Sequence, residues 1–238
     1  MHQIEVNGLV VNVVRKNIKN LHLAVYPPDG RVRVAVPLRV DDEAVRLAVL
    51  TKFSWIRKQQ EKFNQQERQT PREYVSGESH YFQGARYRLN VIQHDGSNMV
   101  VVRNKRFIDL YVRPESSVDQ RRRVMAAWYR QYLKDIIPGV IAKWELLMGV
   151  SVKEWGVKQM KTKWGTCNIN AGRIWINLEL AKKSPRCLEY VIVHEMVHLL
   201  ERLHNDRFKA LMSQYLPQWQ MIREELNREP LAHEEWEY

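Results

Sequence analysis

The residues best suited to chemistry lie in one stretch, residues 190–208, which reads YVIVHEMVHLLERLHNDRF. His194 and His198 are four residues apart, so on a helix they lie one turn apart on the same face and can share a metal ion. Glu195 follows the first histidine, where a carboxylate can take a proton from a metal-bound water without being a ligand itself. The H-E-x-x-H pattern therefore predicts a zinc centre in which Glu195 is the general base.

His204 is the candidate third ligand. On one continuous helix it would be rotated by about 600° from His198 and displaced by about 9 Å along the axis. The helix must therefore end first, and the sequence predicts a turn near Glu201–Leu203. Two good N-caps for a new helix follow, Asn205 and Asp206. The spacing equals that of the metzincin peptidases, but Glu201 stands where they have a turn glycine, which argues against a true metzincin.

Two other interpretations of these residues compete with the zinc centre. A single histidine on an amphipathic helix is usually structural, but three histidines and a glutamate at ligand spacing after an apolar run favour one zinc ion per chain. Cys167 could instead be a nucleophile that works with a histidine. A lone cysteine after Trp-Gly-Thr is more often a small buried residue.

Composition bounds the class of protein. A chain of 238 residues allows one large domain or two small ones. Its two cysteines, Cys167 and Cys187, match no disulfide scaffold and indicate a reducing compartment. The first ten residues lack the pattern of a signal peptide, and no stretch reaches about 18 apolar residues. We expect a cytoplasmic protein without a membrane partner.

The charge is strongly basic and unevenly distributed. The whole chain carries +11, while residues 224–238 carry −5, so the remaining chain carries +16. This balance favours anionic partners, nucleic acid among them, and the acidic tail could cover a basic surface; a solvated basic surface without a ligand is the simpler alternative. We expect the arginines at 121–123, at a helix start where the dipole disfavours cations, to be held by an acidic group or else to be solvated. Aromatic and basic residues alternate in one region, which is typical of nucleic-acid binding or of a half-exposed strand: Tyr81, Arg86, Tyr87, Arg88, Arg103 and Arg106.

The pattern of apolar residues predicts an α+β fold. Strands are expected at 4–14, 21–26 and 31–36, with a hairpin turn at 27–30 and then a helix from Asp41 to about 66. Residues 74–114 predict a small antiparallel sheet, and residues 118–148 a long helix bent near Pro138. We expect two regions: a β-rich region with antiparallel hairpins and one helix over 1–114, and a zincin-like region over 115–238. In the latter, strands at 155–160, 163–169 and 174–177 would form a small antiparallel sheet on the metal helix, with the acidic tail after it.

Four segments together resemble the YgjP-like metallohydrolases, which are grouped with metallopeptidases: Lys163–Cys167, Ile176–Leu178, Tyr190–Leu199 and His204–Phe208. The resemblance is strongest from Val118 to Leu226. It implies that His194, His198 and His204 are zinc ligands and that Glu195 is the catalytic base. Thr166 stands where the family often has serine.

Three functions follow from these observations. The first is a zinc peptidase, in which a strand at 164–168 binds extended peptide by its backbone. The second, suggested by the resemblance, is a nucleoside triphosphate (UTP-type) pyrophosphatase that uses the same zinc site. The third is a SprT-like protease associated with DNA. The candidate substrate contacts are Lys161, Lys163, Trp164, Gly165, Thr166, Asn168 and Arg173.

Overall fold

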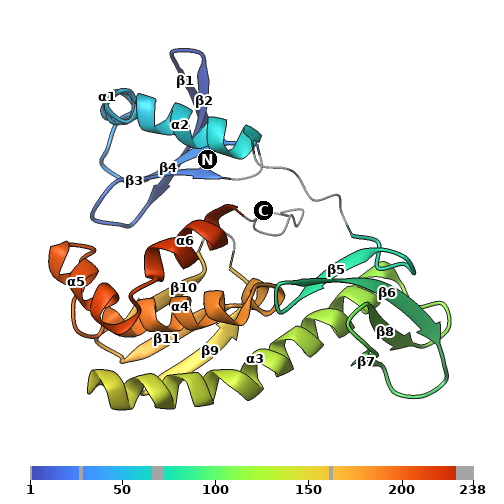
Figure 1. The fold of residues 1–238 in the computed structure, drawn as a ribbon. Coiled ribbons are helices and arrows are strands. Elements are labelled where there is room, and N and C mark those ends of the chain that lie inside the picture. The colour runs from blue at the N-terminus through green and yellow to red at the C-terminus, as the bar shows by residue number, and fades with distance from the viewer. Residues whose placement is uncertain (1, 27–28, 66–71, 161–162, 229–238) are drawn as a thin grey trace. The chain divides into compact units, whose positions relative to one another are not determined.

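The computed structural model describes residues 2–26, 29–65, 72–160 and 163–228. They form two compact units, whose described parts are residues 2–65 and 72–228 (Figure 1). Residues 229–238 of the acidic tail, the turn residues Pro27 and Pro28, and the predicted contact Lys161 lie outside the described residues.

The first unit is a four-stranded sheet with two helices. Its elements are β1 (His2–Val6), β2 (Leu9–Lys16), β3 (His22–Tyr26), β4 (Arg31–Pro37), α1 (Asp42–Thr51) and α2 (Phe53–Gln65). The strand order is β1-β2-β4-β3, with β2 and β4 parallel and the other pairs antiparallel. The predicted pairing of 21–26 with 31–36 is confirmed, because Tyr26 lies opposite Arg31.

The single helix predicted from Asp41 is two helices. Asp41 is the N-cap as predicted, since its side chain accepts a hydrogen bond of 2.9 Å from the backbone N–H of Ala44. Lys52 interrupts the helix and is the C-cap of α1. Val49 of α1 and Ile56 of α2 are both buried in one core with the sheet. The apolar spacing is helical on either side of Lys52 and no glycine or proline marks the break, so the pattern could not reveal it.

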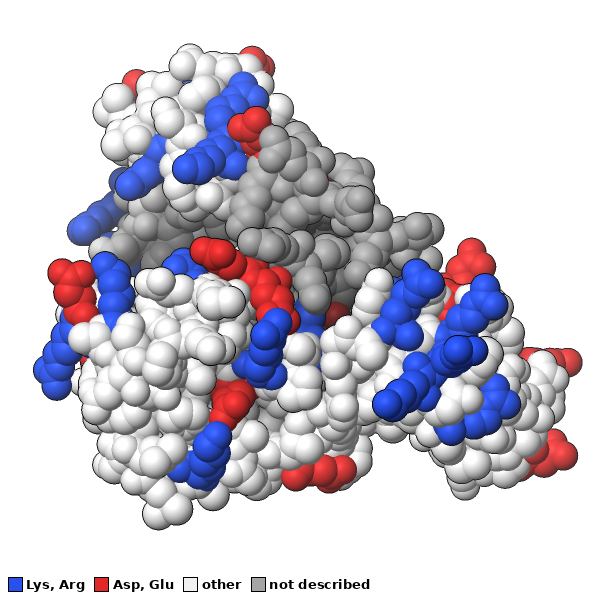
Figure 2. Space-filling model, in the orientation of Figure 1, with Lys and Arg blue, Asp and Glu red and all other residues white. Residues whose placement is uncertain are grey.

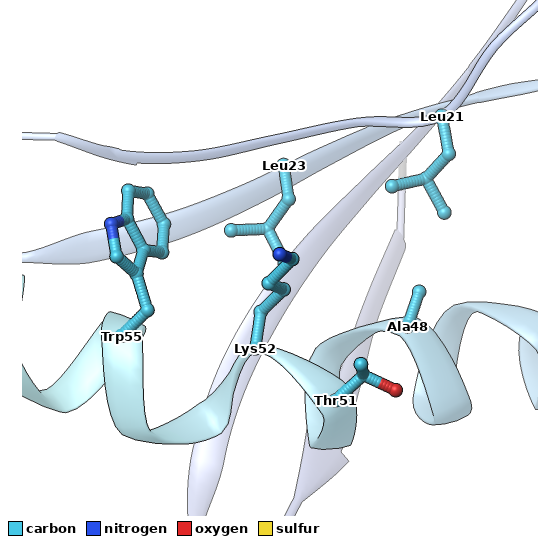
Figure 3. A pocket seen from close by; sticks show the side chains of 6 residues that line it. All are labelled: Leu21, Leu23, Ala48, Thr51, Lys52 and Trp55. Atoms are coloured by element: carbon cyan, nitrogen blue, oxygen red, sulfur yellow. The ribbon is translucent and has the colours of Figure 1, made fainter.

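A pocket of about 510 Å³ lies on this unit, beside β3 and the two helices (Figure 3). It is lined by Leu21, Leu23, Ala48, Thr51, Lys52 and Trp55. None of the residues predicted to act in chemistry lines it.

The second unit begins with another four-stranded sheet: β5 (Ser79–Phe82), β6 (Ala85–Gln93), β7 (Met99–Val102) and β8 (Phe107–Val112). The strand order is β5-β6-β8-β7, and β6 runs parallel to β8. The prediction of a purely antiparallel sheet is therefore wrong at this pair. The chain leaves β6, forms the edge strand β7, and returns as β8 between the two.

The long helix α3 (Val118–Met148) has the predicted limits. Ser117 and Gln120 form a capping box at its start, and Gly149 takes the left-handed conformation that ends it, at φ 66°. Met125 and Tyr129 of α3 share a core with the inner face of the β5–β8 sheet. By its packing, the segment 72–114 therefore belongs with the helix that follows it, whereas the sequence suggested a boundary after 114.

The rest of this unit surrounds the metal-site candidates. Its elements are β9 (Glu154–Lys158), β10 (Gly165–Asn168), β11 (Arg173–Asn177), the 3₁₀-helix η1 (Leu178–Lys182), α4 (Pro185–Val197), α5 (Asp206–Tyr215) and α6 (Trp219–Arg228). The strand order of this sheet is β10-β11-β9. Strand β10 pairs antiparallel with β11 as predicted, but β9 runs parallel to β11, so the sheet is not purely antiparallel. Helix α4 contacts β10 and β11 on one side and α5 and α6 on the other (Figure 1). The fold is α+β, and no described helix has an apolar stretch long enough to cross a bilayer.

Candidate metal centre

Helix α4 contains polar residues of the predicted site, although most of its residues are buried and apolar. Pro185 occupies its first turn, where the missing N–H costs nothing. Val191, Ile192 and Val193 are all buried, as the apolar run before the H-E-x-x-H pattern predicts. A helix buried on most sides exposes a polar side chain only where the surrounding elements leave an opening, and His194 and His198 are half-buried at such a place.

The chain then turns sharply, as predicted. The backbone N–H of Glu201 bonds to the carbonyl of Val197, and α5 begins after Asn205, whose side chain accepts from the N–H of Phe208 at 2.9 Å. Glu201 is not among the residues with a left-handed φ. This turn therefore does not need the glycine that metzincins have at that position.

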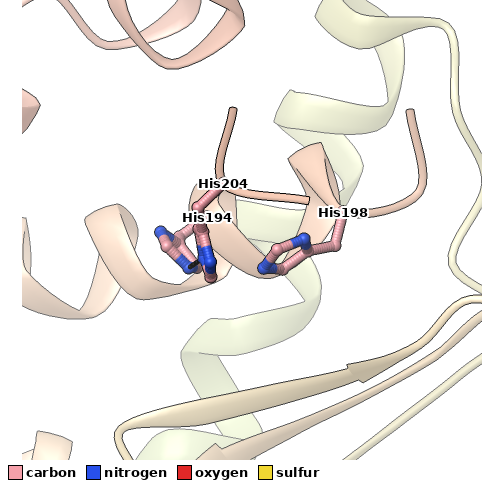
Figure 4. A group of neighbouring side chains, drawn as sticks. All are labelled: His194, His198 and His204. Carbon is pink, nitrogen blue, oxygen red and sulfur yellow. Dashed lines mark hydrogen bonds between the residues drawn. The ribbon is translucent and has the colours of Figure 1, made fainter. Parts of the chain in front are cut away.

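The turn brings His204 back to the two helical histidines (Figure 4). One ring nitrogen of each histidine lies within 4.8 Å of those of the other two, and Nε2 of His204 is 3.0 Å from Nε2 of His194. Burial lowers the pKa of His194 to about 3 and also lowers that of His198. Neutral imidazoles are the form that binds metal, so this set fits a three-histidine zinc site with one open position.

Two contacts orient these rings. Nδ1 of His198 lies 3.2 Å from the carbonyl oxygen of Glu201. If this nitrogen donates its proton there, Nε2 is left to face the other histidines. The buried ring of Phe208 contacts all three imidazoles, with centroids 4.9, 4.8 and 4.7 Å from those of His194, His198 and His204. In the sequence, Phe208 is only an apolar residue of a predicted helix, so its contact with the three imidazole rings could not be predicted.

Glu195, the residue after His194 on α4, occupies a closely fitted place against strand β10. The residue is 6% exposed, and burial raises the pKa of its carboxyl group to about 8, whereas the charge of Lys163 acts to lower that pKa. A Cβ atom on Gly165 of β10 would be 2.6 Å from the carboxylate oxygen Oε1 of Glu195. Gly165 therefore makes room for this carboxylate between α4 and the sheet.

The predicted substrate contacts fall at two ends of the β10–β11 hairpin. Lys163, Trp164 and Gly165 are at the end beside Glu195, with Thr166 half-buried next to them. Nζ of Lys183 lies 5.6 Å from the ring centroid of Trp164.

The other two predicted substrate contacts, Asn168 and Arg173, lie at the far end of the β10–β11 hairpin. Asn168 accepts a hydrogen bond from the N–H of Ala171 in the turn, and Arg173 pairs with Glu154 at 3.1 Å. Three residues of strand, about 10 Å, separate Gly165 from Asn168. These two side chains have structural partners within the sheet, and a substrate role for them stays a prediction.

Two residues near the site, Asn177 and Arg223, were not predicted as functional. Asn177 is buried and donates to the carbonyls of Met160 and Lys163 at 2.8 and 2.7 Å, so it anchors the chain just before β10. The exposed Arg223 of α6 contributes to lowering the pKa of His194. Asn177 belongs to one of the segments that resemble the family, and this resemblance was the only indication in the sequence that Asn177 has a role.

Two further sequence-based expectations can be compared with the structure. Burial, followed by the charge of Glu195, raises the pKa of the Cys167 thiol to about 11. A thiol that stays protonated is a poor nucleophile, which argues against cysteine chemistry.

Of the three arginines at 121–123, Arg121 donates to the side chain of Ser116 and the carbonyl of Tyr74, and Arg122 pairs with Asp119. Local groups thus hold these two.

Helix α4 and the turn after it bring three imidazoles together, and α4 also carries a buried carboxylate; this combination is typical of a metallohydrolase site. Residues 19–229 match the model of the YgjP-like, metallopeptidase domain family, and the chain belongs to that family. No curated protein matches the chain. Among solved structures, the metallopeptidase zymogen of Methanocaldococcus jannaschii jannalysin is similar at 20% identity and a TM-score of 0.33, over 40% of this chain and 92% of that one. A likeness of that extent says nothing about the substrate.

Proposed function

We propose that this protein is a zinc-dependent peptidase that binds one ion per chain through His194, His198 and His204, with Glu195 as general base. The observation that carries the proposal is the convergence of three ring nitrogens, together with a buried carboxylate on the residue that follows His194 and is not itself one of the converging groups. His194, His198 and His204 would hold a zinc ion, which would supply Lewis-acid chemistry by lowering the pKa of a coordinated water and polarising a carbonyl.

Strand β10 supports a peptide as the substrate. It is an edge strand, so among the described strands it is paired only with β11. An unpaired strand edge can bind an extended chain by backbone hydrogen bonds. Because Gly165 of this strand lies against Glu195, a peptide added to β10 would pass close to the carboxylate.

Glu195 would move the proton. A base is most effective when its pKa lies near the working pH, and burial raises the pKa of this carboxyl to about 8. The carboxylate can accept a proton from the attacking water at one oxygen and return it to the leaving amine. Lys163 favours the charged form and so keeps part of the population ready to accept.

A phosphoanhydride hydrolase acting on nucleoside triphosphates is the second candidate, because the cation Lys163 lies near Glu195 and could contact a phosphate. The two substrates differ in their response to salt. Several cationic contacts to phosphate are screened together, whereas binding of a neutral peptide depends little on salt.

The test is to load the protein with zinc and to measure hydrolysis of a peptide library and of a nucleoside triphosphate panel at low and high salt. We expect peptide cleavage that changes little with salt, and we expect His204→Ala to lose both zinc and activity. Triphosphate hydrolysis that weakens steeply with salt, without peptide cleavage, would replace the first candidate with the second. Unchanged zinc affinity in His204→Ala would contradict the ligand assignment.

A further inference from the structure

The β5–β8 sheet has one face in the core and one face open. Phe82, Leu89 and Ile108 on the inner face pack with α3. Strand residues alternate between faces, so their neighbours in sequence point outward. Tyr81 and Val101 on that outer side are 39% and 41% exposed. We call this side the outer face.

The strand register fixes which residues share it. Tyr81 lies opposite Arg86, Ser79 opposite Arg88, and Arg88 beside Phe107. Arg103 follows β7 directly, and its N–H donates to the carbonyl of Phe107. The regular alternation places Tyr87 on the inner side, where it packs near Phe82. Tyr87, one of the residues in the predicted aromatic and basic pattern, is therefore not part of the outer face.

The cations of the outer face are mostly not neutralised by acids. Asp109 is the acidic residue on its strands; it pairs with Arg103 at 3.4 Å and accepts a hydrogen bond from Asn90. Arg86 and Arg88 are exposed, and neither of them has an ion pair with a described residue. Arg106 is also exposed, but it stands in the turn before β8, so the alternation does not assign it to the outer face. Figure 2 shows Lys and Arg side chains gathered over the region of β5 and β6.

Aromatic rings lie among these cations. The guanidinium of Arg103 is 4.9 Å from the centroid of the Phe107 ring, and Arg88 flanks the same residue from β6. Tyr81, beside Arg86, is separated from Phe107 by one strand, which is about 10 Å between strand axes. Two rings, the exposed Tyr81 and the half-buried Phe107, thus alternate with arginines on the outer face.

We propose that the outer face binds single-stranded nucleic acid without sequence preference. Arginines attract the phosphates, and bases released from pairing can stack on Tyr81 and Phe107. A polyanion without bases would use the cations alone, and the bases of a duplex are already stacked on one another. The combination of rings and unpaired cations therefore favours a single strand.

The direct test is fluorescence anisotropy of the full chain with a labelled 20-nucleotide oligo(dT). We expect binding that weakens as salt rises, because phosphate contacts release counterions. In the double variant Arg86→Gln/Arg88→Gln, affinity should fall by at least about 10-fold, and the slope of log affinity against log salt should decrease by about 1.4. Tyr81→Ala should weaken binding by about 5- to 100-fold and leave the slope unchanged.

The matched control is Arg57→Gln/Lys58→Gln on α2, which removes the same charge from exposed positions of the first unit. Its affinity should equal that of the unaltered protein, and urea unfolding of each variant shows whether it is folded. Equal losses in the two double variants would overturn the proposal, because net charge alone would then explain binding. Equal affinity for a duplex or for inorganic polyphosphate would overturn it too.

The face is independent of the proposed hydrolase. Glu195→Gln protein and zinc-free protein should bind the oligonucleotide as tightly as the zinc-loaded protein does. If the protein proves not to be a peptidase, the expected oligonucleotide binding does not change. If it does not bind the oligonucleotide, the peptidase proposal is not affected.

Discussion

The two sheets of the second unit use polar residues in opposite ways. Both are mixed, and both contribute apolar residues to the core that contains α3. The β9–β11 sheet adjoins Glu195, a single buried carboxylate fitted against Gly165. The β5–β8 sheet also has a buried carboxylate, Asp109, but that one is paired with Arg103 and lies on an outer face that carries several exposed arginines. A buried polar group depends on the atoms around it, whereas exposed charges act together and each matters less.

The strongest test of this difference is Glu195→Gln. The amide keeps the size of the side chain but cannot accept the proton, so hydrolysis should fall by about 10²- to 10⁴-fold. Zinc content, measured by elemental analysis, should stay at one ion per chain. Arg86→Gln, which removes one charge from the other sheet, should leave the hydrolysis rate unchanged. Full activity in Glu195→Gln would show that this residue is not the base.

Gly165→Ala tests the fit around the carboxylate. The new methyl group would be 2.6 Å from Oε1 of Glu195 and 2.9 Å from Cγ1 of Val191, so one of them must move. We expect a loss of activity of about 10-fold or more, because a small misplacement of a catalytic group is costly. Overpacking should also lower the free energy of unfolding by about 1 to 3 kcal/mol.

Gly139→Ala is the control for that substitution. Gly139 lies inside α3, and a Cβ there would meet no described atom within 4 Å apart from its chain neighbours and the backbone of its own helix. Alanine in a helix interior should raise stability by about 0.5 to 1 kcal/mol. Chemical denaturation measures the stability of both variants, and peptide hydrolysis measures their activity. Comparable losses of stability and activity in the two variants would mean that the space at Gly165 has no special role.

The smallest expected effect concerns His80, a buried titratable residue on the inner side of the β5–β8 sheet. It is 2% exposed, and its pKa is lowered to about 3, first by burial and then by the charges of Arg72 and Lys182, although Glu78 lies 3.5 Å away. The unfolded chain takes up a proton at His80 near pH 6.5 and the folded chain does not. Stability is therefore lost as pH falls below about 6.5, by about 2 kcal/mol between pH 7 and pH 5.

His80→Leu should remove most of that loss. The measurement is urea unfolding of both proteins at pH 7 and pH 5. An equal decrease in stability in the two proteins would show that other groups cause it. Hydrolysis at pH 7 should not change in the variant, because His80 is not one of the residues at the metal centre.

The parts of the site that could be predicted were those with local signals. The i, i+4 histidines, the turn before His204 and the Asn205 cap each depend on a few neighbouring residues. The limits of α3 were predictable for the same reason, because its apolar spacing is regular over the whole segment.

Contacts between distant segments could not be predicted. The parallel pairs β2–β4, β6–β8 and β9–β11 depend on where the chain crosses over, and the alternation in a strand is the same for either direction. The position of Gly165 against Glu195 is of the same kind. A glycine in a strand indicates a close approach, but the sequence does not say to what.

The placement of Phe208 has a consequence for how zinc would be coupled to folding. Its ring contacts all three imidazoles and is itself part of the large apolar core. The proposed ligands are therefore held by residues that are buried for other reasons, unlike those of small domains that are unfolded without their metal. Zinc should add to stability only by mass action, in proportion to the logarithm of its free concentration. The ion could then be exchanged or withdrawn while the chain stays folded.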